Sequence, residues 1–165
     1  MIEAAITIRP ERAGDHAAIR IVVGEAFGGA QDAQLVDDLR SGGALAVSLV
    51  AEHKGRICGH VALSWLRSPP HALALAPLAV SRDHQRRGIG STLVHGAIDL
   101  AQQQDAEIIF VLGDPGYYQR LGFSAEVAAP FPSPYAGPHF MARGLTANEA
   151  VIAPVIYADA FNRLA

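Results

Sequence analysis

The feature that most limits the fold of this chain lies between residues 71 and 113, where two apolar strands flank one amphipathic helix. HALALAPLAV at 71–80 predicts the first strand, and the continuous apolar run EIIFVLG at 107–113 is typical of a buried parallel strand. Residues 91–104 place their apolar side chains on one helical stripe, which is formed by Leu93, Val94, Ala97, Ile98 and Ala101. Two strands of one sheet that are connected through a helix are usually parallel, and the crossover between them is right-handed. We therefore expect these two strands to form a parallel pair.

The residues before this crossover predict a strand, two helices and two further strands, at 4–10, 16–27, 32–40, 45–53 and 57–66. Asp15 stands at the N-cap position of the first helix, and glycines follow both helices. A turn around Lys54 and Gly55 joins the last two strands.

The residues after the crossover predict a short helix in 114–123, a proline-rich loop at 129–138, and late strands near 139–146 and 151–157. The element order is therefore β-α-α-β-β-β-α-β-α-β-β, and the fold class is mixed α/β. We expect residues 1–165 to form one domain, because the sequence contains no repeat, linker or low-complexity segment.

The composition excludes several classes of protein. Half of the 165 residues are hydrophobic and 18% are charged, which argues against a disordered chain. The formal net charge of −3 argues against a general nucleic-acid-binding surface, and no apolar run reaches the length of a membrane span. Cys58 is the one cysteine, so neither an internal disulfide nor a cysteine-based metal cluster can form. With no signal-peptide pattern, we expect a soluble cytoplasmic protein with no metal, nucleic-acid or membrane partner.

The segment SRDHQRRGIGSTL at 81–93 brings three arginines and two glycines together between the predicted strand and helix. The N–H groups at a helix start have no intrahelical partners, and the helix dipole adds partial positive charge there. The two glycines let the backbone approach a bound group closely, and Arg82, Arg86 and Arg87 add cationic side chains. These features together predict a cradle for a pyrophosphate.

Three known phosphate cradles can be compared with this segment. The P-loop needs a lysine that is absent, and the dinucleotide fingerprint needs a third glycine where Leu93 stands. The third, Q/R-x-x-G-x-G/A, is matched throughout by residues 85–90 and is the signature of the GNAT family of N-acetyltransferases. LAVSRDHQRRGIGSTLV at 78–94 and YYQRLGF at 117–123 resemble that family's core, and VLGDPGYYQRLGF at 111–123 resembles its YhbS-like branch.

This resemblance implies a mostly antiparallel sheet with a central parallel pair that splays apart, flanked by helices. It also implies acetyl-CoA as the co-substrate, with the pantetheine arm held between the splayed strands. The residues that would bind it are Leu78, Ala79, Val80, Gln85, Arg86, Arg87, Gly88, Ile89, Gly90 and Ser91. Backbone groups of Leu78 and Val80 would hydrogen-bond the arm as a neighbouring strand would. The N–H groups from Arg86 to Ser91 would hold the pyrophosphate.

The resemblance also implies one catalytic residue, Tyr118, which stands five residues before Phe123 at the place of the family's tyrosine acid. A phenol is a hydrogen-bond donor at neutral pH and can protonate the departing thiolate. Aromatic packing is the alternative role for this side chain, and Tyr117 is the alternative residue. The oxyanion is expected to meet a backbone N–H between Leu78 and Val80.

The general base is unassigned by the sequence. Many family members carry a glutamate on the strand before the loop, but residues 71–80 contain no carboxylate. Conceivable replacements are His60, His71, Asp114 and Glu25. Cys58 lies in the middle of a predicted strand, so we expect a core residue rather than an acyl-carrying nucleophile. Direct attack by the amine is therefore favoured.

The expected activity is transfer of an acetyl group to a primary amine, on a small molecule or a peptide, within a ternary complex. The first two helices and loop 129–138 are expected to wall the acceptor site, with Phe27, Trp65, Phe131 and Tyr135 as aromatic candidates. The alternative is an acyl-CoA-binding regulatory or interaction module with little turnover, which the missing glutamate motivates. The sequence leaves open the identity of the acceptor and the oligomeric state, a homodimer included.

Overall fold

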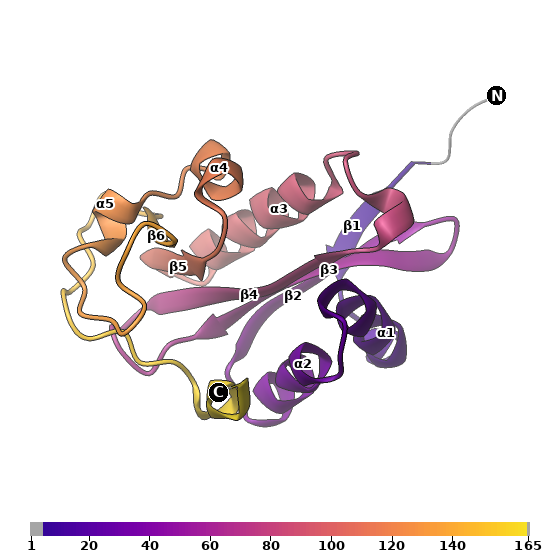
Figure 1. Cartoon of the computed structure of the whole chain (residues 1–165), viewed down its shortest axis with the longest axis horizontal. Coiled ribbons are helices and arrows are strands. Elements are labelled where there is room, and N and C mark those ends of the chain that lie inside the picture. Colours follow the sequence, from indigo (N-terminus) through magenta and orange to yellow (C-terminus); the bar gives the residue numbers. More distant parts are fainter. Residues whose placement is uncertain (1–4, 165) are drawn as a thin grey trace.

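Six strands form one continuous sheet in the computed structural model, which describes residues 5–164 (Figure 1). Their spatial order follows the chain: β1 (Thr7–Pro10), β2 (Leu45–His53), β3 (Arg56–Trp65), β4 (Ala72–Val80), β5 (Ile108–Leu112) and β6 (Phe140–Gly144). Neighbouring strands are antiparallel except for β4 and β5, which are parallel. The predicted mixed fold, mostly antiparallel with one parallel pair, is therefore confirmed.

Helices cover both faces of this sheet (Figure 1). The three long ones are α1 (His16–Phe27), α2 (Gln31–Ser41) and α3 (Ile89–Gln103). Helices α1 and α2 lie on one face and α3 on the other. Because side chains of a strand alternate between the two faces, Leu49 of β2 packs in the cluster that contains the α3 stripe, whereas Val50 packs with α1 and α2. The crossover helix predicted between β4 and β5 is α3.

The predicted strand at 151–157 is wrong. Within that segment Ile156 forms an isolated bridge with Ser68, and no longer ladder follows. A proline interrupts the segment and supplies no N–H to a ladder. The next N–H, that of Val155, donates to the carbonyl of Pro132 in the proline-rich loop at 2.8 Å. The segment is therefore held against the loop instead of extending the sheet.

Several short helices add to the predicted elements, among them the 3-10 helices η1 (Ala13–Asp15) and η2 (Arg82–His84). Helix α5 (Ala125–Ala128) begins at Ser124, whose hydroxyl accepts a hydrogen bond from an N–H of its first turn. The 3-10 helix η4 (Asp159–Leu164) follows the misassigned segment. Its Phe161 packs with Leu39 of α2, so the C-terminal aromatic residues reach the α2 side of the sheet.

Strands β4 and β5 diverge soon after they begin. Their parallel pairing joins Ala72–Ala74 to Ile108–Phe110 and ends there, although β4 continues to Val80. The register of β4 against β3 shifts around Pro77, which places the proline in a bulge where a missing N–H is tolerated. Beyond Ala74, β4 is therefore paired on one edge and open on the other.

Asp15 precedes α1 as predicted, but its carboxylate does not cap that helix. It accepts instead from the backbone N–H of Arg12 at 2.7 Å and from the guanidinium of Arg9 at 2.7 and 3.1 Å. Arg9 also donates to Glu52 of β2 at 2.8 Å. The Arg9 hydrogen bond lowers the pKa of Asp15 to about 2 against the opposing effect of burial. These bonds join β1 to β2 and to the start of α1.

A second polar network, centred on Glu11, ties α1 and α2 to the sheet. Arg40 donates to both carboxylate oxygens of Glu11 at 2.8 Å, and His16 lies 2.9 Å from one of them. The hydroxyl of Ser48 also donates to Glu11, and it lies 2.8 Å from Nε2 of the fully buried His60. Burial alone would raise the pKa of Glu11, but the Arg40 and Ser48 hydrogen bonds lower it overall.

This network fixes the protonation state of His60. The one hydroxyl proton of Ser48 goes to Glu11, so Ser48 accepts from Nε2–H of His60. Nδ1 of His60 is then an acceptor that has no partner among residues 5–164. Burial lowers the pKa of His60 to about 4, because a second ring proton would place an unpaired charge in the core.

We expect the free energy of unfolding to fall as the pH drops from about 6.5 to 4.5. The folded-state pKa of His60 is about 4, against 6.5 for the free side chain, so the unfolded chain takes up this proton first. The slope approaches about 1.4 kcal/mol per pH unit for one proton. The lowered pKa of Glu11 affects stability only below about 4.5. Urea unfolding of the wild type and of His60→Gln, which keeps a donor for Ser48 but does not titrate, measures this. An equal slope in both proteins would contradict the assignment.

Candidate active site

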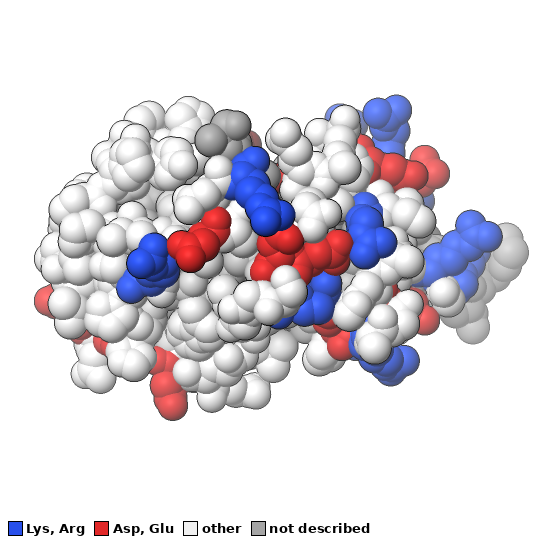
Figure 2. All heavy atoms as spheres, turned by 90° about the horizontal axis from the view of Figure 1, so that it is seen from below, with Lys and Arg blue, Asp and Glu red and all other residues white. Residues whose placement is uncertain are grey.

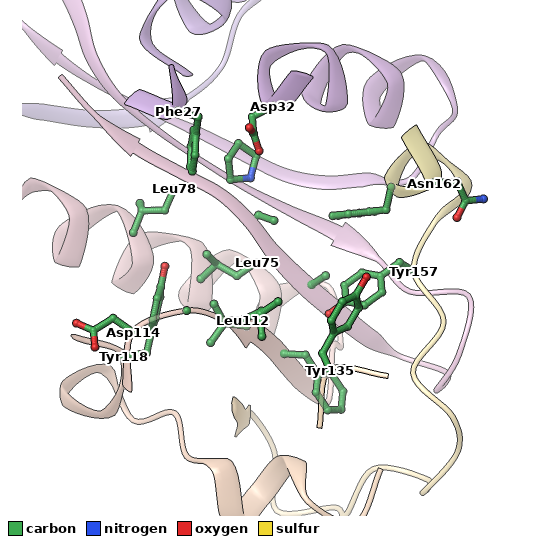
Figure 3. A pocket seen from close by; sticks show the side chains of 17 residues that line it. Phe27, Asp32, Leu75, Leu78, Leu112, Asp114, Tyr118, Tyr135, Tyr157 and Asn162 are labelled. Carbon is green, nitrogen blue, oxygen red and sulfur yellow. The ribbon is translucent and has the colours of Figure 1, made fainter. Parts of the chain in front are cut away.

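A cavity of about 630 Å³ opens where β4 and β5 diverge (Figure 3). Its walls include residues 74–78 of β4, residues 110–114 at the end of β5, and Tyr118 of α4 (Pro115–Tyr118). Side chains of α1, α2, the proline-rich loop and the C-terminal segment complete it. Apolar residues dominate the wall, as is common in small-molecule sites.

The backbone of β4 presents hydrogen-bonding groups to this cavity. The N–H of Ser81 donates to the carbonyl of Cys58 on β3 at 2.8 Å. Because backbone groups of a strand alternate between its two edges, Ala79 also turns toward β3, whereas Leu78 and Val80 turn toward the open edge. The side chain of Gln85 donates to the carbonyl of Val80 at 3.1 Å. The N–H and C=O of Ala79 therefore belong to the β3 ladder, and the expected backbone contacts at Leu78 and Val80 face the open edge.

The loop after β4 has the backbone geometry that the glycine-rich signature predicts. Arg86 and Gly88 have φ angles of 64° and 79°, and helix α3 begins immediately afterwards at Ile89. The first helical hydrogen bond runs from the N–H of Thr92 to the carbonyl of Gly88 at 3.0 Å. The preceding N–H groups, up to Ser91, lie in the first turn, where an α-helix supplies no partner. A negatively charged group would therefore be favoured at this helix start.

Helix α4 packs against this helix start. A Cβ atom added to Gly90 would lie 2.5 Å from the hydroxyl oxygen of Tyr117. Tyr117 and Tyr118 meet edge to face, with ring centroids 5.0 Å apart. The glycine at position 90 therefore permits two close approaches, one by α4 and one by any group bound at the helix start.

Tyr118 lies on the wall of the cavity. Its ring packs over Gly113, where an added Cβ would lie 2.6 Å from the ring carbon Cε2, and edge-on to Phe123 at 5.8 Å. Figure 3 shows its hydroxyl directed into the cavity, toward Leu78. Burial raises the pKa of Tyr118 to about 12, so at neutral pH the phenol is protonated and available as a donor.

The four conceivable bases lie in different places. Asp114 lines the cavity and caps α4 by accepting from the N–H of Gly116 at 3.2 Å. Glu25 lines a separate hollow of about 330 Å³ beside Gln85. His60 belongs to the Glu11 network, and neither it nor His71 is among the described residues that line the main cavity.

Cys58 is a core residue, as predicted. It is 2% exposed and packs in the cluster that joins β2, β3 and α3. Burial raises the pKa of its thiol, so the nucleophilic thiolate is disfavoured.

The acceptor side of the cavity combines predicted and unexpected residues. Of the aromatic candidates, Phe27 and Tyr135 line it, whereas Trp65 and Phe131 pack in the core clusters. The sequence analysis missed four lining residues, which are Asp32, Tyr157, Phe161 and Asn162. Tyr157 ends the segment that was predicted as a strand, Phe161 and Asn162 follow it, and no sequence signal placed them near β4.

The surface carries no sign of a polyanion-binding face on the side formed by α1 and α2. Figure 2 shows acidic and basic side chains interleaved there, in agreement with the ion pairs Arg20–Asp37 and Arg40–Glu11. Over the described residues, no group of three or more His, Cys, Asp or Glu side chains is placed to hold a metal ion. None of the helices in that range is both long and apolar enough to cross a membrane.

Comparison with known proteins gives a consistent result. The model of the acetyltransferase (GNAT) family matches residues 19–123. The uncharacterized N-acetyltransferase YhbS of Escherichia coli K12 is 34% identical over 126 residues, which are 74% of each chain. The uncharacterized N-acetyltransferase YjhQ of the same organism is 32% identical over 147 residues, 81% of each chain.

Two solved structures extend the likeness to the whole fold. Crystalline YhbS from Escherichia coli in complex with CoA matches with a TM-score of 0.90 and 28% identity, over 100% of this chain and 96% of that one. A GNAT family acetyltransferase from Brucella melitensis in complex with acetyl-CoA matches with a TM-score of 0.82 and 30% identity, over 96% and 99% of the two chains.

Proposed function

The chain belongs to the acetyltransferase (GNAT) family, and we propose that it transfers an acetyl group from acetyl-CoA to a primary amine by direct attack in a ternary complex. One observation carries this proposal. The open edge of β4 connects the start of α3, where an anion is favoured, to the cavity that Tyr118 lines. A pyrophosphate at one end and a thioester at the other suit this path. The complexes of the relatives with CoA and acetyl-CoA support it.

Acetyl-CoA would be held mainly by the backbone. The N–H groups between Arg86 and Ser91 would bind the pyrophosphate, with the arginine side chains adding attraction. The N–H and C=O groups of Leu78 and Val80 would pair with the amides of the pantetheine arm, which would take the place of a neighbouring strand where β5 has diverged. Because Gln85 already donates to the carbonyl of Val80, this side chain must share or release that acceptor when the arm enters.

The chemistry needs an acid and an oxyanion donor. The neutral amine attacks the thioester carbon, and the developing oxyanion would be met by an N–H of β4 near Leu78. When the C–S bond breaks, the sulfur takes the electron pair and the hydroxyl of Tyr118 would supply the proton. The amine gives its own proton to a base or to water. No covalent acetyl-enzyme is required, and the buried Cys58 is poorly placed for one.

The direct test is acetyl-CoA consumption across a library of amines, with free CoA as the readout and binding of acetyl-CoA measured in parallel by calorimetry. Turnover with at least one amine supports the proposed function. Tight binding of acetyl-CoA without turnover of any amine would favour the alternative, an acyl-CoA-binding regulatory module. Absence of both would contradict the family's activity in this chain.

Gly90→Val should abolish detectable acetyl-CoA binding, because its side chain fills the approach to the helix start. The new Cβ would also meet the hydroxyl of Tyr117 at 2.5 Å, while the nearest ring carbon is at 3.7 Å. The comparison is therefore made between Tyr117→Phe and the double variant that also carries Gly90→Val. We expect the single variant to bind and the double variant not to. Equal affinity would show that the loop does not hold the pyrophosphate.

Tyr118→Phe should lower kcat by about 10²–10⁴-fold, the usual range for general acid catalysis, with little change in acetyl-CoA affinity. The substitution keeps the ring packed on Gly113 and Phe123. Tyr117→Phe is the matched control, because it removes the neighbouring hydroxyl. A normal kcat in Tyr118→Phe would contradict the role of Tyr118 as general acid and would leave this side chain with a packing role.

Cys58→Ala should leave turnover intact and lower the free energy of unfolding by about 1 kcal/mol, because it deletes a buried side-chain atom from the core. Intact-mass spectrometry during turnover is expected to find no acetylated enzyme. An acetyl adduct in the wild type that disappears in this variant would replace direct attack by a covalent mechanism.

A further inference from the structure

The end of the cavity away from Tyr118 is aromatic. Figure 3 shows Tyr135 and Tyr157 together at that end, with Tyr118 and Asp114 at the other. The rings of Tyr135 and Tyr157 meet edge to face at 5.8 Å, and Tyr157 contacts Phe161 at 5.0 Å. These rings come from the proline-rich loop and the C-terminal segment. They present an apolar aromatic surface that fits a ring or a short hydrocarbon body.

One carboxylate, that of Asp32, interrupts the apolar upper wall of the cavity. Asp32 lies in the first turn of α2 and is half-buried. Figure 3 places it beside Phe27, on the side of the cavity opposite Leu112 and Tyr118. Among the described residues the carboxylate of Asp32 has neither a hydrogen bond nor an ion pair, whereas the other lining carboxylate, that of Asp114, caps α4. A half-buried carboxylate without a cation is an attractive site for a positively charged group.

We propose that the acceptor is a small primary amine with an aromatic or hydrocarbon body, held by Asp32 at its ammonium group and by Tyr135 and Tyr157 at its body. This inference rests on the proposed function and names the substrate class of the same site. Free primary amines are protonated at neutral pH, and both a carboxylate and the faces of aromatic rings attract an ammonium ion. Asp32 would bind and orient the acceptor before its proton is lost to water, and is a positioning residue.

The size and charge of the cavity narrow the class further. Its volume of about 630 Å³ must also receive the thioester end of acetyl-CoA, so a small molecule fits better than a peptide segment. An acceptor with a carboxylate beside its amine would be repelled by Asp32, because like charges in a poorly solvated site are unfavourable. The site should therefore prefer an arylalkylamine to the amino acid with the same ring.

The experiment compares 2-phenylethylamine with phenylalanine, butylamine and spermidine as acceptors. We expect the highest kcat/KM with 2-phenylethylamine and little turnover of phenylalanine, whose carboxylate is its one addition. Asp32→Asn should raise the KM for 2-phenylethylamine on the order of tenfold, the loss of one charge-assisted hydrogen bond. The affinity for acetyl-CoA should not change. The variant should also discriminate less between 2-phenylethylamine and phenylalanine.

Matched variants separate these effects from general ones. Asp99→Asn makes the same charge change on the exposed face of α3 and should leave every constant unchanged. Tyr135→Ala, at a residue that is 48% exposed, should raise the KM for 2-phenylethylamine more than that for butylamine. Thermal melting of each variant checks that the fold is retained.

The outcomes distinguish the inference from the proposed function. If the wild type does not bind acetyl-CoA, both the proposed function and the inference about the acceptor are overturned. Turnover of spermidine or a peptide in preference to 2-phenylethylamine, with no effect of Asp32→Asn, would overturn the inference and leave the acetyltransferase activity standing. If acetyl-CoA binds without turnover, calorimetric titration of 2-phenylethylamine into the CoA-loaded protein decides the matter. No binding there, or binding unaffected by Asp32→Asn, would also overturn it.

Discussion

The site depends on one interruption of hydrogen bonding, the end of the β4–β5 ladder at Ala74 and Phe110. A strand inside a sheet normally has both edges paired, and a buried edge without partners costs free energy. Here β4 continues to Val80 with β3 on one side only, so the backbone groups on its other edge have no strand partner, and residues 74–78 line a cavity. The same divergence carries the end of β4 toward α3 and the end of β5 toward α4. The start of α3 and the half-buried phenol of Tyr118 consequently lie along one open strand edge.

The opposite wall depends on how α1 and α2 are held. Glu11 binds Arg40 of α2 and Ser48 of β2, and Ser48 in turn binds His60 of β3. A partly buried ionic network of this kind fixes the relative positions of the elements that it joins, whereas its net contribution to the free energy of unfolding can be close to zero. The two helices are joined through Gly28, whose φ of 73° ends α1 in the left-handed conformation that glycine favours. The short connection sets Phe27 and Asp32 above the cavity, on either side of one turn.

Local patterns were predicted well because their geometry is encoded in a few neighbouring residues. The run at 107–113 became the buried parallel strand, and the sequence at 85–90 formed the glycine turn at a helix start. The turn at Lys54 and Gly55 has positive φ at both residues. By contrast, residues 151–157 combine strand-forming side chains with a proline, and their hydrogen bonds go to a loop and to a single bridge. The conformation of residues 151–157 therefore depends on hydrogen-bond partners that are distant in the sequence.

The sequence by itself determined the crossover and the glycine turn before α3, because each follows from periodicity or spacing within one segment, whereas Tyr118 was singled out by the resemblance to the GNAT family. Tertiary structure decided which backbone groups of β4 remain open, since that depends on the register with β3 and on the point where β5 departs. It also decided the acceptor wall. Asp32 and Tyr157 are far apart in sequence and meet at one cavity only because α2 and the C-terminal segment pack against the same face of the sheet. Contacts between segments that are distant in the sequence cannot be predicted from the periodicity or motif spacing of either segment.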